Sequence, residues 1–180
     1  MNSFYTEEEI ALMGFKSIGK NVLISKKASF YGIENISLGN NVRIDDFCIL
    51  PGNIKIGNYV HIAAFCGLYG KFGIHMEDYT ALSIRCTLLS ATDDFSGEYL
   101  VGPTIEPYKI NVTGGEIKLK KYVIIGLNSV VFPKIYIGEG TVVGAMSLVN
   151  RNLKEWGVYF GVPVKRINER SKSLLRFINT

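Results

Sequence analysis

The sequence repeats large apolar side chains at a spacing of six residues, in four separate runs. The runs are Ile18, Ile24, Phe30 and Ile36; Leu38, Ile44, Leu50, Ile56, Ile62 and Leu68; Met76, Leu82 and Leu88; and Leu119, Ile125, Val131, Ile137, Val143 and Val149. Neither a helix, with about 3.6 residues per turn, nor an isolated strand, with a period of two, produces a sustained six. The spacing predicts a triangular coil of three short strands, stacked on the next coil through parallel pairing.

Two further positions of the repeat support this coil. The fourth residue after each apolar residue is mostly small or β-branched: Val22, Ala28, Val42, Cys48, Val60, Cys66, Thr80, Cys86, Val123, Ser129, Thr141 and Ser147. The residue directly after each large apolar residue is often glycine: Gly19, Gly39, Gly57, Gly126, Gly138 and Gly144. We expect large side chains at the axis, small ones near the corners, and Gly or Asn in tight turns that need a positive φ. The asparagines at such turns are Asn21, Asn40, Asn41 and Asn58. Two-residue slips at 36–38 and 74–76 predict corner bulges.

The repeat also predicts where the three cysteines lie. Cys48 and Cys66 are 18 residues apart, which is one coil, and Cys86 follows after one coil plus the slip. We expect a single inward column of small buried side chains. Cys86 remains a candidate catalytic residue, because the chain leaves the coil only a few residues later. Cysteines without a close pair indicate a reducing compartment and give no metal-binding motif.

The repeat divides the chain into one domain, 1–180, with coils at 17–88 and 116–150. Thr6, Glu9 and Gly14 form a capping box and a stop signal, which predict a helix over 7–13. The stretch NERSKSLLRFI predicts a second helix over 166–178. The segment 89–115, LSATDDFSGEYLVGPTIEPYKINVTGG, has no hexad pattern. A loop of this length inside a compact domain is usually functional.

Composition excludes several classes of function. The chain has 180 residues, of which 47% are hydrophobic and 20% charged, and it contains no apolar stretch long enough to span a bilayer. The N-terminus lacks the basic and apolar regions of a secretory signal, so we expect a cytoplasmic protein without membrane insertion. A net charge of +4 without a Lys/Arg stripe favours small anionic ligands over nucleic acid.

The hexad pattern, the stretch GEIKLKKYVIIGLNSVVFPKIYIGEGTVVGAMSLV and the ending GVPVKRI resemble the hexapeptide-repeat acyltransferases. The resemblance implies an all-β fold, a left-handed parallel β-helix with short terminal helices and one protruding loop. It further implies acyl-CoA, with acetyl-CoA favoured, as co-substrate, and a homotrimer with active sites between subunits. Coenzyme A candidates carried over from the family are Gly126, Gly144, Ala145, Pro163, Lys165 and Arg166. The alternatives are a turn requirement for the glycines and a solvated basic surface for Lys165 and Arg166.

The loop departs from the family's best-known members in one informative respect. Galactoside, maltose and xenobiotic acetyltransferases carry a catalytic histidine where this chain has Asp93 and Asp94, in SATDDFSG. A hydroxyl group needs a general base to attack a thioester, whereas a neutral amine is already nucleophilic. The loop and the opening FYTEEEIALMGFKSIGKNVLI also resemble small acyltransferases of bacterial surface-polysaccharide gene sets. Some of these N-acylate nucleotide-linked amino sugars, and the resemblance implies that substrate class here.

This resemblance gives the acidic loop residues a role. Asp94 is the candidate for binding and orienting the sugar amine, with Asp93 and Glu98 as further substrate-binding candidates. Turn formation through local backbone hydrogen bonds is the alternative for both aspartates.

Three outward positions on the coils complete the candidates. His61 and His75 each precede an inward residue, and Ser83 follows one, so all three face outward. His61 is a candidate catalytic residue and Ser83 a candidate substrate-binding residue, while a surface or trimer-contact role is the alternative for both histidines.

Three competing functions follow from the same residues. An O-acetyltransferase would use His61 as its general base, and a non-catalytic coil would serve as an assembly subunit. A metal-dependent hydratase like the γ-carbonic anhydrases needs three histidines around each metal, whereas this chain has two. We therefore expect no metal.

Overall fold

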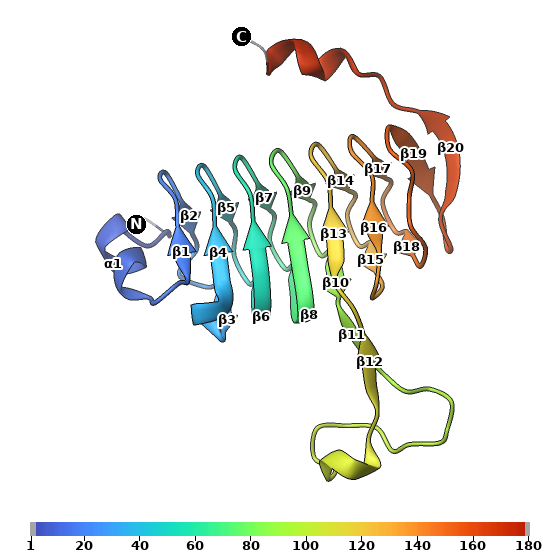
Figure 1. Ribbon diagram of the computed structural model, residues 1–180. Helices are drawn as coiled ribbons and strands as arrows, with labels where there is room; N and C mark the ends of the chain where they lie inside the picture. The colour runs from blue at the N-terminus through green and yellow to red at the C-terminus, as the bar shows by residue number, and fades with distance from the viewer. Residues whose placement is uncertain (1–2, 179–180) are drawn as a thin grey trace.

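The computed structural model describes residues 3–178, which form a left-handed parallel β-helix (Figure 1). Helix α1 (Glu7–Leu12) covers one end of the stacked coils, and β20 (Lys165–Glu169) lies at the other. A long loop projects sideways from the coils, as the sequence predicts. Among the described residues there is no helix with the length and apolarity needed to cross a membrane.

Parallel strands build three faces. The first face contains β1 (Ser17–Ile18), β4 (Ile36–Leu38), β6 (Ile49–Ile56), β8 (Gly67–Met76), β13 (Ile117–Leu119) and β16 (Tyr136–Ile137). The second face contains β2 (Leu23–Ile24), β5 (Arg43–Ile44), β7 (His61–Ile62), β9 (Ala81–Leu82), β14 (Ile124–Ile125), β17 (Val142–Val143) and β19 (Gly157–Phe160). The third face contains β3 (Ser29–Tyr31), β10 (Thr87–Leu89), β15 (Val130–Val131), β18 (Leu148–Val149) and the first parts of β6 and β8.

The remaining elements lie outside these faces. They are η1 (Ile33–Asn35), β11 (Ala91–Asp93), η2 (Pro107–Lys109), β12 (Val112–Gly114) and η3 (Ser173–Phe177).

The apolar residues of the hexads fill the axis, as predicted, and those of the central coils are fully buried. The slips are two-residue insertions at corners. Gly52 of β6 pairs with Gly70 of β8, and Ile54 of β6 pairs with Ile74 of β8. Between these two pairs, β8 therefore has two more residues than β6. At the first slip the extra residues form the 3-10 turn η1 instead of a bulge within a strand.

The cysteines form the inward column that the sequence predicts. Cys48, Cys66 and Cys86 are buried, and each thiol donates to a backbone carbonyl of the next coil at 3.1 Å. Contact with Cys66, together with burial, raises the pKa of the Cys48 thiol. Contact with Cys66 lowers the pKa of the Cys86 thiol, but all three side chains are buried at the axis and serve as packing residues.

We expect Cys66→Ala to lower the free energy of unfolding by only about 1 kcal/mol, because the change removes a single buried atom. Turnover should stay nearly intact, because Cys66 faces the axis. Urea unfolding and steady-state kinetics measure the two quantities. A folded Cys66→Ala protein without activity would contradict the inward assignment.

The positive φ angles fall at a different position from the one predicted. Asn21 and Asn41 have φ of 55° and 56°, as expected, but Asn40 and Asn58 do not have positive φ. The position is the third after each apolar residue, and its other occupants are Phe47, Tyr59, Phe65, Tyr79, Arg85, Tyr122, Asn128, Lys134, Met146 and Trp156. The corner of each coil therefore imposes the positive φ on whichever residue occupies it. Aromatic residues at this position also stack from coil to coil, as the Tyr59 and Tyr79 rings do at 4.8 Å and 1°.

The glycines that follow the apolar residues serve close packing between coils. A Cβ on Gly39 would lie 2.5 Å from the carbonyl oxygen of Gly57, and one on Gly126 would lie 2.6 Å from the Ala145 nitrogen. Neither glycine has a positive φ. The prediction that these glycines make left-handed turns is therefore wrong. Glycine is needed at these positions because the backbone of the neighbouring coil leaves no room for a Cβ atom.

The structure confirms the predicted N-terminal helix, whereas the prediction of a C-terminal helix is wrong. Thr6 caps α1 through a capping box with Glu9, and Gly14 follows with φ of 84°. Of the predicted helix 166–178, only η3 is helical, and as a 3-10 turn. Residues 165–169 form β20 because the open edge of β19 offers antiparallel backbone partners.

Candidate functional site

The projecting loop begins with an antiparallel stem of β11 and β12. Asp93 ends β11 opposite Val112 and is half-buried. Among residues 3–178, its carboxylate has no hydrogen-bond or ion-pair partner. The stem thus fixes the backbone of Asp93 and leaves its charge available.

Asp94, the next residue, is engaged within the loop itself. Its Oδ1 accepts from the Ser96 N–H at 2.7 Å, and its Oδ2 accepts from Asn111 Nδ2 at 2.8 Å. The hydrogen bonds from Ser96 and Asn111 lower the pKa of Asp94. Glu98 is exposed two residues beyond Ser96. Asp94 therefore closes a turn and ties the two sides of the loop, a partnership with Asn111 that sequence reasoning missed.

Ser83, Gly126 and Gly144 lie beside one another on successive coils of the second face. The Ser83 N–H donates to the Ile125 carbonyl at 2.9 Å, and Gly126 makes the same contact one coil later. Phe160 then closes the column, since a Cβ on Gly144 would meet its ring at 1.8 Å. Ser83, Gly126 and Gly144 thus form one column of small residues, which runs from Ser83 toward the C-terminal end of the coils.

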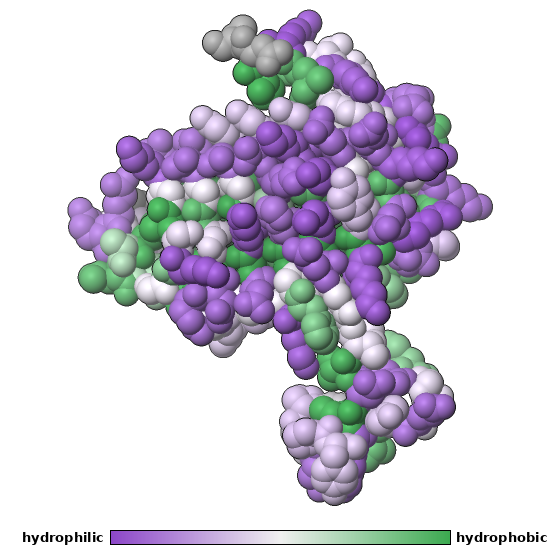
Figure 2. Space-filling model, viewed as in Figure 1, coloured by the Kyte–Doolittle hydropathy of each residue, from purple (hydrophilic) through white to green (hydrophobic). Residues whose placement is uncertain are grey.

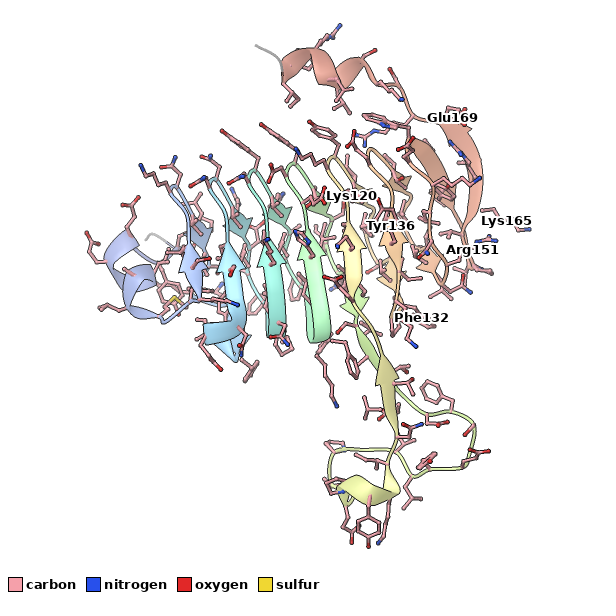
Figure 3. All side chains as sticks on the ribbon, in the orientation of Figure 1. Lys120, Phe132, Tyr136, Arg151, Lys165 and Glu169 are labelled. Atoms are coloured by element: carbon pink, nitrogen blue, oxygen red, sulfur yellow. The ribbon has the colours of Figure 1, made fainter. Side chains whose placement is uncertain are left out.

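The predicted basic residues lie near the C-terminal end of that column. Pro163 is in the turn between β19 and β20, and Lys165 begins β20. Figure 3 shows Lys165 and Arg151 together at this end of the coils. Arg166 donates to Glu169 Oε2 at 2.7 Å, so part of its guanidinium is occupied.

His61 belongs to a charged cluster on the second face. Its Nε2 lies 2.8 Å from Asp45 Oδ2, and Arg43 Nε donates to Asp45 Oδ1 at 2.7 Å. Burial raises the pKa of Asp45, but hydrogen bonds from His61 and Arg43 outweigh it, and the net shift is downward. Sequence reasoning missed Asp45. The coil length contained the signal, because Arg43 precedes His61 by 18 residues, which is one coil, and Asp45 follows Arg43 by two.

Two other candidates lie elsewhere. Cys86 is fully buried, and its Sγ donates to the Gly126 carbonyl. The prediction that Cys86 is catalytic is therefore wrong, because its thiol faces the axis and is closed off from substrate. His75 faces outward on the first face between Lys55 and Lys118, where burial and Lys55 lower its pKa.

The two halves of the candidate site are separate in one chain. The acidic loop projects away from the coils (Figure 1). His61 lies on β7, Ser83 follows β9, and Gly126 and Gly144 follow β14 and β17, all on the coils. Within residues 3–178, His, Cys, Asp and Glu side chains form no group of three or more that can hold a metal ion.

Comparisons with known proteins agree with this architecture. The family model described as bacterial transferase hexapeptide (six repeats) matches residues 35–70. The chain is 43% identical over 176 residues to an Escherichia coli protein named dTDP-4-amino-4,6-dideoxy-D-glucose acyltransferase, covering 96% of this chain and 92% of that protein.

Solved structures give the same result. AntD, an N-acyltransferase from Bacillus cereus in complex with dTDP and 3-hydroxybutyryl-CoA, is 54% identical with a TM-score of 0.96, covering 99% of this chain and 96% of AntD. A variant of AntD in complex with dTDP-4-amino-4,6-dideoxyglucose and coenzyme A is 53% identical with a TM-score of 0.97, covering 99% and 97%.

Proposed function

The chain belongs to the hexapeptide-repeat acyltransferases, among the N-acyltransferases of nucleotide-linked amino sugars, and we propose that its acceptor is a dTDP-linked 4-amino-4,6-dideoxy sugar. It transfers an acyl group from acyl-CoA to the sugar amine. The observation that carries this function is a match along nearly the whole chain, loop included, to AntD with dTDP-4-amino-4,6-dideoxyglucose and coenzyme A bound. The acidic loop fits an amine acceptor, since neither histidine lies on it.

The reaction needs little from the protein beyond orientation. The neutral amine attacks the thioester carbon, a C–N bond forms, the C–S bond breaks, and the amine proton passes to the departing thiolate. We propose that the carboxylate of Asp93 binds the amine, because it is half-buried and unpaired among the described residues. Asp94, engaged with Ser96 and Asn111, would shape the loop. This revises the expectation that Asp94 binds the amine.

The other candidates fit around this reaction. We propose that Ser83 contacts the sugar, and that the pantetheine follows Gly126, Gly144 and Ala145 toward Pro163, Lys165 and Arg166. The position of Ser83, Gly126 and Gly144 in one column on adjacent coils supports this course. We place Glu98 at the rim of the site, since its carboxylate is exposed.

A homotrimer would complete the site. Exposed apolar side chains continue down the corner between the second and third faces in the C-terminal coils: Ile84, Leu127 and Met146. The projecting loop carries others, such as Phe95 at 84% and Leu100 at 54%, and Figure 2 shows apolar surface there. Contiguous apolar surface of this kind marks association. We propose that the loop of one subunit reaches the second face of its neighbour.

We propose a cytoplasmic enzyme of surface-polysaccharide biosynthesis with acetyl-CoA as donor. The three free cysteines support a reducing compartment. AntD binds 3-hydroxybutyryl-CoA, so that longer donor is the competitor to test.

A thiol-release assay tests the function. The wild-type protein is given acetyl-CoA or 3-hydroxybutyryl-CoA, with dTDP-4-amino-4,6-dideoxyglucose or its 4-hydroxy counterpart. We expect thiol release only with the amino sugar, and faster release with acetyl-CoA. Equal release with the hydroxy sugar would favour O-acylation with His61 as base, and no release with either sugar would contradict the function.

A further inference from the structure

The N-terminal coils carry a cavity that the proposed mechanism leaves unused. It has a volume of about 350 Å³, within the range of small-ligand pockets. Its lining combines aromatic rings with charge: Ser3, Phe4, Arg43, Asp45, Asp46, Phe47, Ala64 and Phe65. Backbone pairing holds the N-terminal segment here, since Phe4 forms a bridge with Ser25 and the Tyr5 N–H donates to the Ile24 carbonyl at 2.9 Å. The cavity is thus walled by the first residues of the chain on one side and by coils on the other.

Asp45 orients two cationic or hydrogen-bonding groups at this cavity. It accepts from Arg43 Nε at 2.7 Å and lies 2.8 Å from His61 Nε2, and only 18% of its side chain is exposed. Arg43 is left with both terminal NH₂ groups unpaired among residues 3–178, and its side chain is 53% exposed. His61 likewise keeps Nδ1 without a partner there. A guanidinium fixed at Nε and open at its terminal nitrogens suits the oxygens of a phosphate group.

Three aromatic side chains of the lining, Phe4, Phe47 and Phe65, could bind the base of a nucleotide, beside the phosphate-binding groups. The Arg43 guanidinium lies 5.3 Å from the centre of the Phe4 ring, and the Phe47 and Phe65 rings stack at 5.0 Å. Lys27 adds a cation 5.2 Å from the Phe47 ring, although it also pairs with Asp46. Aromatic side chains next to basic groups bind bases by stacking and phosphates by charge.

The position of the cavity agrees with the order of the other candidates. Asp45, Ala63 and Ser83 follow one another on successive coils of the second face. Two coil steps of about 4.8 Å put Asp45 roughly 10 Å from Ser83. The coenzyme A candidates continue from Ser83 in the opposite direction, toward the C-terminal end. A hexose at Ser83 would therefore extend its diphosphate toward Arg43 while the acyl donor arrives from the other side.

We propose that Arg43 and His61, oriented by Asp45, bind the diphosphate of the sugar nucleotide, and that the wall of Phe4, Phe47 and Phe65 receives its thymine. This inference rests on the proposed function, since it assigns the nucleotide part of that substrate. It gives His61 a binding role instead of the general-base role of an O-acetyltransferase.

Calorimetric titration of the full chain with dTDP tests the proposal. We expect Arg43→Ala to raise the Kd for dTDP by about ten- to a hundred-fold, as the loss of charge-assisted hydrogen bonds does. The Kd for thymidine, which lacks phosphate, should change much less. Arg43→Lys, which keeps the charge but loses the fork, should lie between wild type and Arg43→Ala. Lys55→Ala is the matched control, because Lys55 is an exposed strand cation on the first face.

Acetyl-CoA affinity distinguishes this site from the donor site and should be the same in all four proteins. An unchanged Kd for dTDP in both Arg43 variants, or a raised Kd for acetyl-CoA instead, would overturn the proposal. Circular dichroism and sedimentation confirm fold and assembly, and Arg43→Lys keeps the test decisive if Arg43→Ala is unstable. A wild-type protein that fails to bind dTDP would instead refute the proposed function itself.

Discussion

Asp93→Asn is expected to lower kcat/KM for the amino sugar by about 10²-fold or more. A charge-assisted hydrogen bond to an amine contributes a few kcal/mol, and each ~1.4 kcal/mol corresponds to a factor of ten in rate. Asparagine has nearly the same shape as aspartate, so the stem of β11 and β12 should persist. Steady-state kinetics measure the loss, with circular dichroism to confirm the fold. Acetyl-CoA affinity should barely change, because the proposed donor site lies on the coils and not on the loop.

Asp94→Asn is the matched control for this prediction. The asparagine side chain still offers an oxygen to the Ser96 N–H, so the turn should survive and kcat/KM should fall by about ten-fold or less. The opposite pattern, a severe loss in Asp94→Asn beside a nearly normal Asp93→Asn, would return the amine-binding role to Asp94.

Ile125→Ala is expected to lower the free energy of unfolding by about 2–5 kcal/mol. Ile125 is fully buried at the axis, between Leu82 and Val143 of adjacent coils. The substitution leaves a cavity that stacked coils cannot close, because their backbone pairing fixes the spacing. Urea unfolding measures the loss.

Ile167→Ala is the control for Ile125→Ala, since it removes the same atoms from a residue that is 63% exposed on β20. Its expected cost is within about 0.5 kcal/mol, as for other surface substitutions. Similar losses in the two variants would contradict the assignment of the axis.

The sequence alone determined the axis of the coil and the residues that fill it. Ile62 and Cys66 could be placed inside from spacing, because each coil repeats the same environment and the same face must be apolar every time. The capping box at Thr6 could be read because it depends only on residues three apart. Asp93 and Asp94 could be located on a functional loop, since the interruption of a regular pattern is itself visible.

Only the tertiary structure decided which residues meet across coils. The left-handed φ of Tyr79 follows from its place at a corner of the coil, and its stacking on Tyr59 depends on the adjacent coil; a residue's own preference gives no hint of either. Residues 165–169 became a strand because β19 left backbone groups unpaired.

The same reason separates the predicted from the unpredicted parts of the site. The candidate positions came from local patterns, but their charges are set by partners far away in the chain. Asp94 is held by Asn111 across the loop, and His61 by Asp45 from the preceding coil. A hydrogen bond forms where folding brings two groups within about 3 Å. Spacing along the chain determines that distance only after the coils have stacked.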